Sequence, residues 1–173
     1  MHGNESVVKD AMSEIESVSC IAFKQRNDED GYVYFTSSDF GCYTYLGYQG
    51  DQQVLNLGDG CMYKGTIMHE ILHALGFLHM QSAYDRDDYI EIIWDNMMPG
   101  LEAQFEKSGS NIISHFAGGY DYKSIMHYGG AAFSKNGKLT IKTKDPNQQT
   151  FIGNRNGMSD EDIHKLNIMY NCY

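Results

Sequence analysis

An eleven-residue segment near the middle of the chain, HEILHALGFLH over residues 69–79, holds the side chains best suited to chemistry. His69 and His73 are four positions apart, so a helix of about 3.6 residues per turn places both imidazoles on one face. Two imidazoles in that arrangement can bind one zinc ion. Glu70 follows the first histidine and is offset around the helix, so its carboxylate reaches a metal-bound water rather than the metal. Glu70 is therefore the candidate catalytic base.

His79 is the candidate third ligand, and it lies six residues beyond His73. A continued helix would carry His79 away from the first two histidines, so the helix must end between them and the chain must turn back. Gly76 permits such a turn, because glycine adopts positive φ at little steric cost. Three protein ligands leave one position of a tetrahedral zinc ion open for water. An open position is typical of catalytic zinc sites and not of structural ones.

A second interpretation of the same segment is an amphipathic core helix that carries its histidines by coincidence. Ile71, Leu72 and Leu75 have the apolar character of core residues. Burial of several histidines without a metal would, however, require a hydrogen-bond partner for each of them. The combined spacing of His, Glu and Gly therefore favours the zinc site. Other histidines lack ligand spacing and are expected to be structural: His115, His127 and His164.

Hydrophobic periodicity predicts the elements that must position these residues. Helices are predicted over residues 5–18, 66–75 and 94–107, and from Ser159 onward, where Ser-Asp-Glu-Asp resembles a capping box. Alternating apolar residues predict strands at 20–23, 32–35, 55–57 and 139–141. Strands come mostly before the central helix and loops come mostly after it. This order predicts an α+β protein in two lobes.

Length and charge limit the classes of partner. A chain of 173 residues suits one domain. The net charge of −10 disfavours nucleic acids and anionic membranes, because phosphate binding needs clustered Lys and Arg. No apolar run approaches the roughly 18 residues that a membrane span needs. The start, MHGNESVVKD, has no apolar stretch and is not expected to be a signal peptide.

The cysteines are well separated along the chain and form no C-x-x-C pair: Cys20, Cys42, Cys61 and Cys172. This spacing disfavours a structural zinc knuckle and leaves either disulfides or free buried thiols. An even number of cysteines allows several disulfide pairings, and spacing alone does not choose among them. Two disulfides would place the protein in an oxidising compartment.

The extended pattern HExxHxxGxxH resembles that of the metzincin metallopeptidases, in which a methionine-containing turn lies beneath the zinc ion. Residues 124–128 read SIMHY and match that turn, in a form similar to the astacin family. The resemblance runs from about residue 5 to the C-terminus. Further matching segments are Gly41-Cys42, Gly58 to Cys61, Gly76-Phe77, Asp85-Arg86-Asp87, Tyr120-Asp121-Tyr122, and Ile163 to Tyr170 before Cys172.

The resemblance implies a metzincin-like, two-lobed catalytic domain over residues 1–173. The N-terminal lobe (1–79) would hold a twisted mixed sheet and the active-site helix. The C-terminal lobe (80–173) would be rich in loops and would carry the Met-turn and a terminal helix. Met126 would pack beneath the metal, and Tyr128 would be a fifth zinc ligand or a donor to the transition state. The implied disulfides are Cys42–Cys61 and Cys20–Cys172.

The function that the resemblance implies is that of a secreted, extracellular zinc endopeptidase with one Zn²⁺ per chain. It would hydrolyse internal bonds of extracellular proteins through a zinc-bound water activated by Glu70. The protein or peptide substrate would bind extended in the cleft, and we expect a monomer with no nucleic-acid partner and no membrane span. The Asp85–Asp88 run is expected to be structural, as a solvated face or as local ion pairs.

The chain departs from the astacin pattern in two places. Typical astacins carry a Glu after the third zinc histidine, and that Glu contacts the buried mature N-terminus; here the position is Met80. The chain is also expected to lack the family's first strand. These departures motivate an alternative function, a zinc-containing binding module that has lost catalysis. The presence of Glu70 argues against that alternative, and the open coordination position argues against a purely structural zinc protein.

Overall fold

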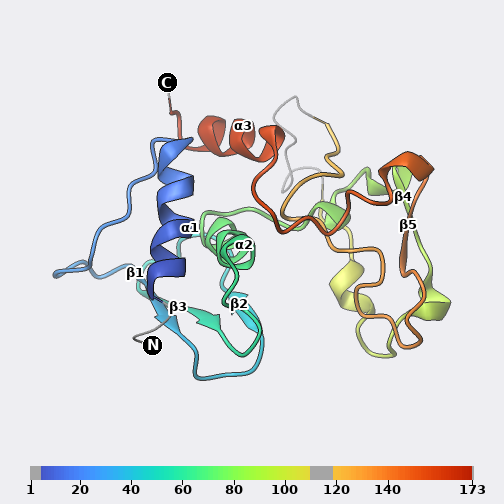
Figure 1. The fold of residues 1–173 in the computed structure, drawn as a ribbon, viewed down its shortest axis with the longest axis horizontal. Helices are drawn as coiled ribbons and strands as arrows, with labels where there is room; N and C mark the ends of the chain where they lie inside the picture. The colour runs from blue at the N-terminus through green and yellow to red at the C-terminus, as the bar shows by residue number, and fades with distance from the viewer. Residues whose placement is uncertain (1–4, 110–118, 173) are drawn as a thin grey trace. The chain divides into compact units, whose positions relative to one another are not determined.

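The computed structural model describes residues 5–109 and 119–172, so the prediction for His115 falls outside the described residues. The described chain forms two compact units (Figure 1). Unit 1 holds the residues up to Phe77 together with Arg155 onward, and unit 2 holds Leu78–Asn154. The secondary structure is α+β, as predicted. Within the described ranges, no helix has the length and apolar character that a membrane crossing requires.

Unit 1 contains a three-stranded mixed sheet with the order β1-β3-β2. β1 (Tyr32–Thr36) runs parallel to β3 (Gln52–Leu57), and β2 (Cys42–Thr44) runs antiparallel to β3. The strands predicted around residues 32–35 and 55–57 are therefore confirmed. β3 is central and is the most deeply buried strand, with Leu55 and Leu57 at 0% and 1% exposure.

The helices of unit 1 are α1 (Glu5–Ser17), α2 (Lys64–Ala74) and α3 (Asp160–Met169). α2 packs against α1 and also against β2 and β3, as Figure 1 shows for the green and blue ribbons. The buried apolar side chains of the two helices include Ala11, Ile15, Ile67, Met68 and Leu72. The helix that carries two of the predicted zinc ligands is thus anchored in the core of unit 1.

α3 begins at the predicted capping box. The Ser159 side chain accepts a hydrogen bond from the Asp162 N–H (3.0 Å), and the Asp162 carboxylate accepts one from the Ser159 N–H (3.1 Å). Each side chain thereby satisfies one of the N–H groups that a helix start leaves without partners. The Asn167 amide donates to the Val18 carbonyl at 2.8 Å and so ties α3 to the end of α1.

Two disulfides close unit 1, and both have the pairing that the resemblance implies. Cys42 of β2 bonds to Cys61 in the loop before α2, and Cys20 after α1 bonds to Cys172 after α3. The two cysteines of each pair are 19 and 152 residues apart, respectively. The second disulfide therefore joins the two chain segments that make up unit 1.

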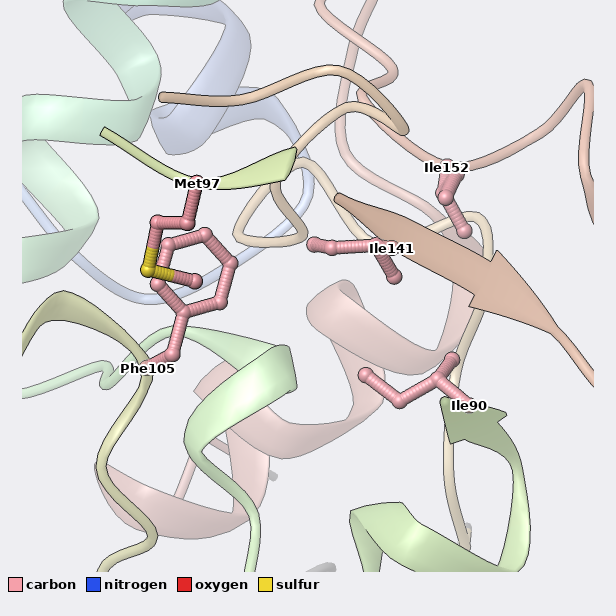
Figure 2. Close-up of a cluster of buried hydrophobic side chains, with 5 residues drawn as sticks. All are labelled: Ile90, Met97, Phe105, Ile141 and Ile152. Atoms are coloured by element: carbon pink, nitrogen blue, oxygen red, sulfur yellow. The ribbon is translucent and has the colours of Figure 1, made fainter. Parts of the chain in front are cut away.

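Unit 2 contains the antiparallel pair β4 (Ile90–Ile92) and β5 (Ile141–Thr143). Short 3-10 helices cover Met80–Ser82, Arg86–Asp88, Trp94–Asn96, Glu102–Phe105 and Pro146–Gln148. Figure 2 shows the core of this unit, which gathers side chains from β4, β5 and the loops around them: Ile90, Met97, Phe105, Ile141 and Ile152. The strand predicted at 139–141 is present, but it begins later, at Ile141.

The helix predicted over residues 94–107 is wrong. The segment forms two 3-10 helices, and Pro99 and Gly100 lie between them. Gly100 has φ of +86°, which is outside the helical region. Proline also removes an N–H group and disfavours a helical conformation in the residue before it. Met97 and Phe105 are both buried, as the apolar periodicity suggests, but Met97 directly follows the first 3-10 helix and Phe105 ends the second.

The strand predicted at residues 20–23 is also wrong, because the segment has no regular secondary structure and pairs with no strand of the described chain. Its N–H groups are bonded in other ways. The Phe23 N–H donates to the Glu16 carboxylate at 2.7 Å, and the Cys20 N–H donates to the Cys172 sulfur at 3.1 Å. A strand needs a neighbouring strand, and alternation of apolar residues does not supply one.

The two disulfides should differ in how much they stabilise the fold. Loop-closure entropy predicts a loss of about 5 kcal/mol for Cys20→Ala/Cys172→Ala and about 3 kcal/mol for Cys42→Ala/Cys61→Ala, because the first loop is longer. Urea unfolding of both double variants and the wild type measures the difference. A larger loss in the second variant would show that local packing around β2, and not chain entropy, dominates.

Candidate metal centre

α2 places the imidazoles of His69 and His73 on one face, one helical turn apart. Their Nε2 atoms lie 3.1 Å apart and their rings meet edge to face, with centroids 4.6 Å apart. Two nitrogens bound at about 2.1 Å to a tetrahedral zinc ion would be roughly 3.4 Å apart. The spacing of the two Nε2 atoms therefore suits two ligands of one zinc ion.

The hydrogen bond on the far side of His73 determines which nitrogen is available to a metal. His73 Nδ1 lies 2.7 Å from the Phe77 carbonyl oxygen, which can only accept a hydrogen bond. Nδ1 therefore carries the proton, and Nε2 of the neutral ring presents its lone pair. Burial is the main cause that lowers the pKa of His73, so the neutral form is favoured. A carbonyl that orients a ligating histidine in this way is a common feature of metal sites.

Gly76 ends α2 in the manner that the sequence predicts. Its φ is +99°, the Gly76 N–H donates to the His73 carbonyl (2.9 Å), and the Phe77 N–H donates to the Leu72 carbonyl (2.9 Å). These two bonds form a Schellman motif, in which glycine in the left-handed region terminates the helix. The chain then leaves the helix axis before it reaches His79.

The turn brings the third histidine to the other two. His69, His73 and His79 each offer one nitrogen, and these nitrogens all lie within 4.8 Å of one another. His69 is buried and the other two are partly buried. Neutral imidazole nitrogens are ligands that zinc prefers, and three of them match the protein ligands of a catalytic zinc site. The donor set and its spacing therefore fit a zinc ion.

Glu70 lies beside the first ligand and is 5% exposed. Burial raises the pKa of its carboxyl to about 7, and the positive charge of Arg155 opposes part of that shift. Desolvation disfavours the charged carboxylate, so the carboxyl group has a stronger affinity for a proton than an exposed glutamate. A side chain with a pKa near neutrality can both accept and return a proton.

Tyr128 and Met126 lie in the turn over residues 124–128 of unit 2. The Ser124 hydroxyl accepts a hydrogen bond from the Met126 N–H at 3.0 Å, and Met126 is 1% exposed. The Tyr128 ring contacts the His79 ring, with centroids 4.4 Å apart. The turn therefore places a buried methionine and a tyrosine next to the segment that carries the third histidine.

The remaining predicted residues have structural surroundings. His127 is fully buried, and its ring nitrogens lie 2.7 Å from the Tyr120 hydroxyl and 2.7 Å from the Tyr128 carbonyl oxygen. His164 lies on α3. Arg86 forms one of the expected local ion pairs, with Asp87, and it is 5% exposed and also donates to main-chain carbonyls. Sequence reasoning had also not singled out Gln81, which is fully buried.

Met80 occupies the position directly after His79 and is 6% exposed. Its N–H donates to the Met126 carbonyl at 3.1 Å, so its main chain joins the 3-10 helix Met80–Ser82 to the turn at residues 124–128. The Met80 side chain belongs to the buried apolar residues of unit 2. The departure from the astacin pattern therefore places an apolar side chain where that pattern has a carboxylate.

The histidine cluster fits a zinc ion of the catalytic type, and comparison with known proteins gives the family. Residues 2–171 match the family described as Astacin (Peptidase family M12A). The chain belongs to the astacin family. It is 45% identical over 170 residues to zinc metalloproteinase nas-13 of Caenorhabditis elegans, covering 98% of this chain and 37% of that protein. It is 43% identical over 172 residues to high choriolytic enzyme 1 of Oryzias latipes, covering 98% and 62%.

Solved structures show the same fold. The structure of high choriolytic enzyme 1, a hatching enzyme zinc-protease from Oryzias latipes, matches with a TM-score of 0.93 at 41% identity and covers 100% of this chain and 85% of that chain. Myroilysin matches with a TM-score of 0.62 at 21% identity and covers 98% of this chain and 87% of that chain. At this identity the match supports a shared fold and nothing more. The metzincin-like α+β fold is thereby confirmed. The chain spans 37%, 53% and 29% of the length of three of its nematode relatives.

Replacement of Met80 by glutamate should destabilise this protein. The substitution places a carboxylate at a position that is only 6% exposed, which costs free energy unless the group is paired or protonated. We expect a lower free energy of unfolding for Met80→Glu at pH 7, with part of the loss recovered at pH 5, where the carboxyl is protonated more readily. Met80→Leu, which roughly conserves volume, is the control and should cost less than about 1.5 kcal/mol. Equal stability of Met80→Glu and wild type would show that a partner for the carboxylate exists.

Proposed function

We propose that this chain is a zinc-dependent endopeptidase that hydrolyses internal peptide bonds of extracellular proteins. The observation that carries the proposal is the convergence of three imidazoles beside a buried glutamate. The names of its relatives, which include zinc metalloproteinases and a hatching enzyme zinc-protease, support the same reaction class.

His69, His73 and His79 would hold one Zn²⁺ per chain. The bound ion would supply a Lewis acid that polarises the scissile carbonyl and lowers the pKa of water towards 7. The hydrogen bond from His73 Nδ1 to the Phe77 carbonyl holds this imidazole in the tautomer that a metal needs. Of the three histidines, His69 is the buried one, at 5% exposure.

Glu70 is the proposed general base and acid. One of its carboxylate oxygens takes a proton from the attacking water, and the carboxyl group then gives that proton to the nitrogen of the leaving amine. Both transfers are favoured when the pKa of the group lies near the working pH, and burial raises the pKa of Glu70 to about 7. Its position next to His69 on α2 fixes it relative to the histidine cluster.

Tyr128 is the proposed electrophilic partner. Its hydroxyl would donate a hydrogen bond to the oxyanion that develops when the scissile carbonyl is attacked. The contact of its ring with the His79 ring supports this role, because it puts the side chain next to a proposed ligand. Met126 would support the centre by packing, as its near-complete burial indicates.

The proposed substrate is an extended protein or peptide segment. β2 stands at an edge of the sheet order β1-β3-β2 and packs against α2. An extended peptide can add to such an edge as a further strand, so that main-chain hydrogen bonds hold it while its side chains alternate. Binding along β2 would hold the scissile bond in a single orientation.

We further propose that residues 1–173 act as one catalytic domain, as a monomer, outside the cell. The two disulfides support an extracellular location, because disulfides persist in oxidising compartments. The net charge of −10 supports the absence of a nucleic-acid partner.

Glu70→Gln should keep zinc but lose hydrolysis. The amide preserves the size of the side chain and cannot take a proton, so casein hydrolysis should fall by a factor of at least about 10². Zinc content by atomic absorption should stay at one ion per chain. Glu102→Gln makes the same chemical change at an exposed position and serves as the control.

The same assay separates the alternative function. Casein hydrolysis that a chelator abolishes would support the peptidase. Wild-type protein that binds zinc but does not hydrolyse casein would favour a binding module that has lost catalysis. Hydrolysis that persists in Glu70→Gln would instead remove Glu70 from the mechanism while leaving the peptidase assignment in place.

Tyr128→Phe should reduce turnover more than zinc binding. Loss of one oxyanion donor lowers kcat by roughly 10²–10³ in other enzymes, and the ring contact with His79 is kept by phenylalanine. Steady-state kinetics on a fluorogenic peptide, with Tyr34→Phe at a half-exposed position of β1 as the control, measure the effect. An unchanged kcat would show that the hydroxyl takes no part in the reaction.

A further inference from the structure

The main chain of Tyr128 is held by a side chain that follows the third histidine. Gln81 lies two residues after His79, in the 3-10 helix Met80–Ser82, and none of it is exposed. Its Oε1 accepts a hydrogen bond from the Tyr128 N–H at 3.2 Å. One residue earlier, the Met80 N–H bonds to the Met126 carbonyl. The segment that leaves His79 is therefore joined to the turn carrying Tyr128 at two successive residues.

The carbonyl of Tyr128 is held from a different direction. His127 Nδ1 lies 2.7 Å from that oxygen, and because a carbonyl only accepts, Nδ1 is the donor. His127 Nε2 then accepts from the Tyr120 hydroxyl at 2.7 Å. The Tyr120 ring stacks on Tyr89, with centroids 4.6 Å apart and an interplanar angle of 9°. Both peptide groups of Tyr128 are thus bonded to buried side chains of unit 2.

A buried arginine supports both Gln81 and the ring that packs on Tyr128. Arg86 Nη1 donates to the Gln81 carbonyl at 2.7 Å and to the Phe105 carbonyl. The Phe105 ring lies edge to face with the Tyr128 ring, with centroids 5.8 Å apart. The guanidinium therefore fixes the residue that bonds the Tyr128 main chain and a residue that contacts the Tyr128 side chain.

The amide group of Gln81 is not explained by local packing. Its Nε2 is buried and has no hydrogen-bond partner in the described part of the chain, which is unfavourable for a polar group. A methionine has a similar length and would avoid that unpaired donor. What methionine would lack is the oxygen that accepts from the Tyr128 N–H. The part of the amide that has a role is therefore Oε1, which accepts the hydrogen bond from Tyr128.

We propose that Gln81 is a positioning residue for Tyr128, holding its main chain so that the hydroxyl meets the developing oxyanion. The proposal rests on the proposed function, in which Tyr128 is the oxyanion donor. In this role Gln81 would act through the tyrosine, to which it is hydrogen-bonded, and not on the substrate or the ion. Displacement of a catalytic group by about 1 Å can cost a factor of 10² in rate, so the loss of this hydrogen bond is measurable in turnover.

The test is a double-mutant cycle between Gln81→Met and Tyr128→Phe, with kcat, KM and zinc content measured for each variant on a fluorogenic peptide. We expect Gln81→Met to lower kcat roughly 10- to 100-fold with KM and zinc content unchanged, because only transition-state stabilisation is lost. In the Tyr128→Phe background the same substitution should leave kcat unchanged, since the group that it positions is already absent. Gln104→Met, at an exposed position, is the matched control.

The results of the cycle test three things separately: the positioning role of Gln81, the role of Tyr128 and the proposed peptidase function. An equal fall in kcat in both backgrounds, or a loss of zinc, overturns the positioning role of Gln81. An unchanged kcat in Tyr128→Phe alone overturns the role of Tyr128 and with it this inference, and wild-type protein without activity overturns the proposed function.

A second variant keeps the test available if Gln81→Met does not fold. Gln81→Glu retains an acceptor oxygen, and its buried carboxyl favours the neutral form, which has the shape of the amide. We expect Gln81→Glu to keep nearly the wild-type kcat. A fall in kcat of about tenfold or more, equal in the wild-type and Tyr128→Phe backgrounds, overturns the proposal.

Discussion

The candidate site depends on one backbone conformation, the positive φ of Gly76. If α2 continued through residue 79, His79 would lie about 240° around the helix axis from His73 and could not share a metal ion with it. The φ of +99° and the two hydrogen bonds of the Schellman motif stop the helix soon after the second histidine. A residue with a side chain is strained in that conformation. The candidate metal centre therefore depends as much on this glycine as on the three imidazoles.

The burial of α2 serves both stability and chemistry. Ile67, Met68 and Leu72 fix the helix in the core of unit 1, and a Cβ on Gly65 would collide with the Arg155 main chain, so that segment approaches the helix closely. The same exclusion of water is the main cause that raises the pKa of Glu70 and lowers that of His73. A neutral imidazole at His73 and a proton acceptor of moderate strength at Glu70 thus follow from the packing that holds the helix in place.

Local signals in the sequence predicted the features of the fold and of the candidate site that depend on local structure. The ligand spacing, the helix end at Gly76 and the capping box at Ser159 involve residues within one or two turns of each other. The errors arose where long-range contacts decide. Residues 20–23 are strand-like in sequence but pair with no strand in the described chain, and Pro99-Gly100 divides a segment whose apolar spacing is helical. The buried positions of Gln81 and Arg86 depend on contacts with distant residues, which a single sequence does not reveal.

The departure at Met80 affects a side chain and not the connection that the site requires. The link between the segment after His79 and the turn at residues 124–128 is made by the Met80 main chain and by the Gln81 side chain. Any residue with an N–H group can supply the first of these bonds, whereas the second needs an acceptor of the length of glutamine. The chemistry of the side chain at position 80 can therefore differ from the astacin pattern without altering how Tyr128 is held. The side chain at position 80 instead contributes to the packing of unit 2, where this chain has the apolar Met80.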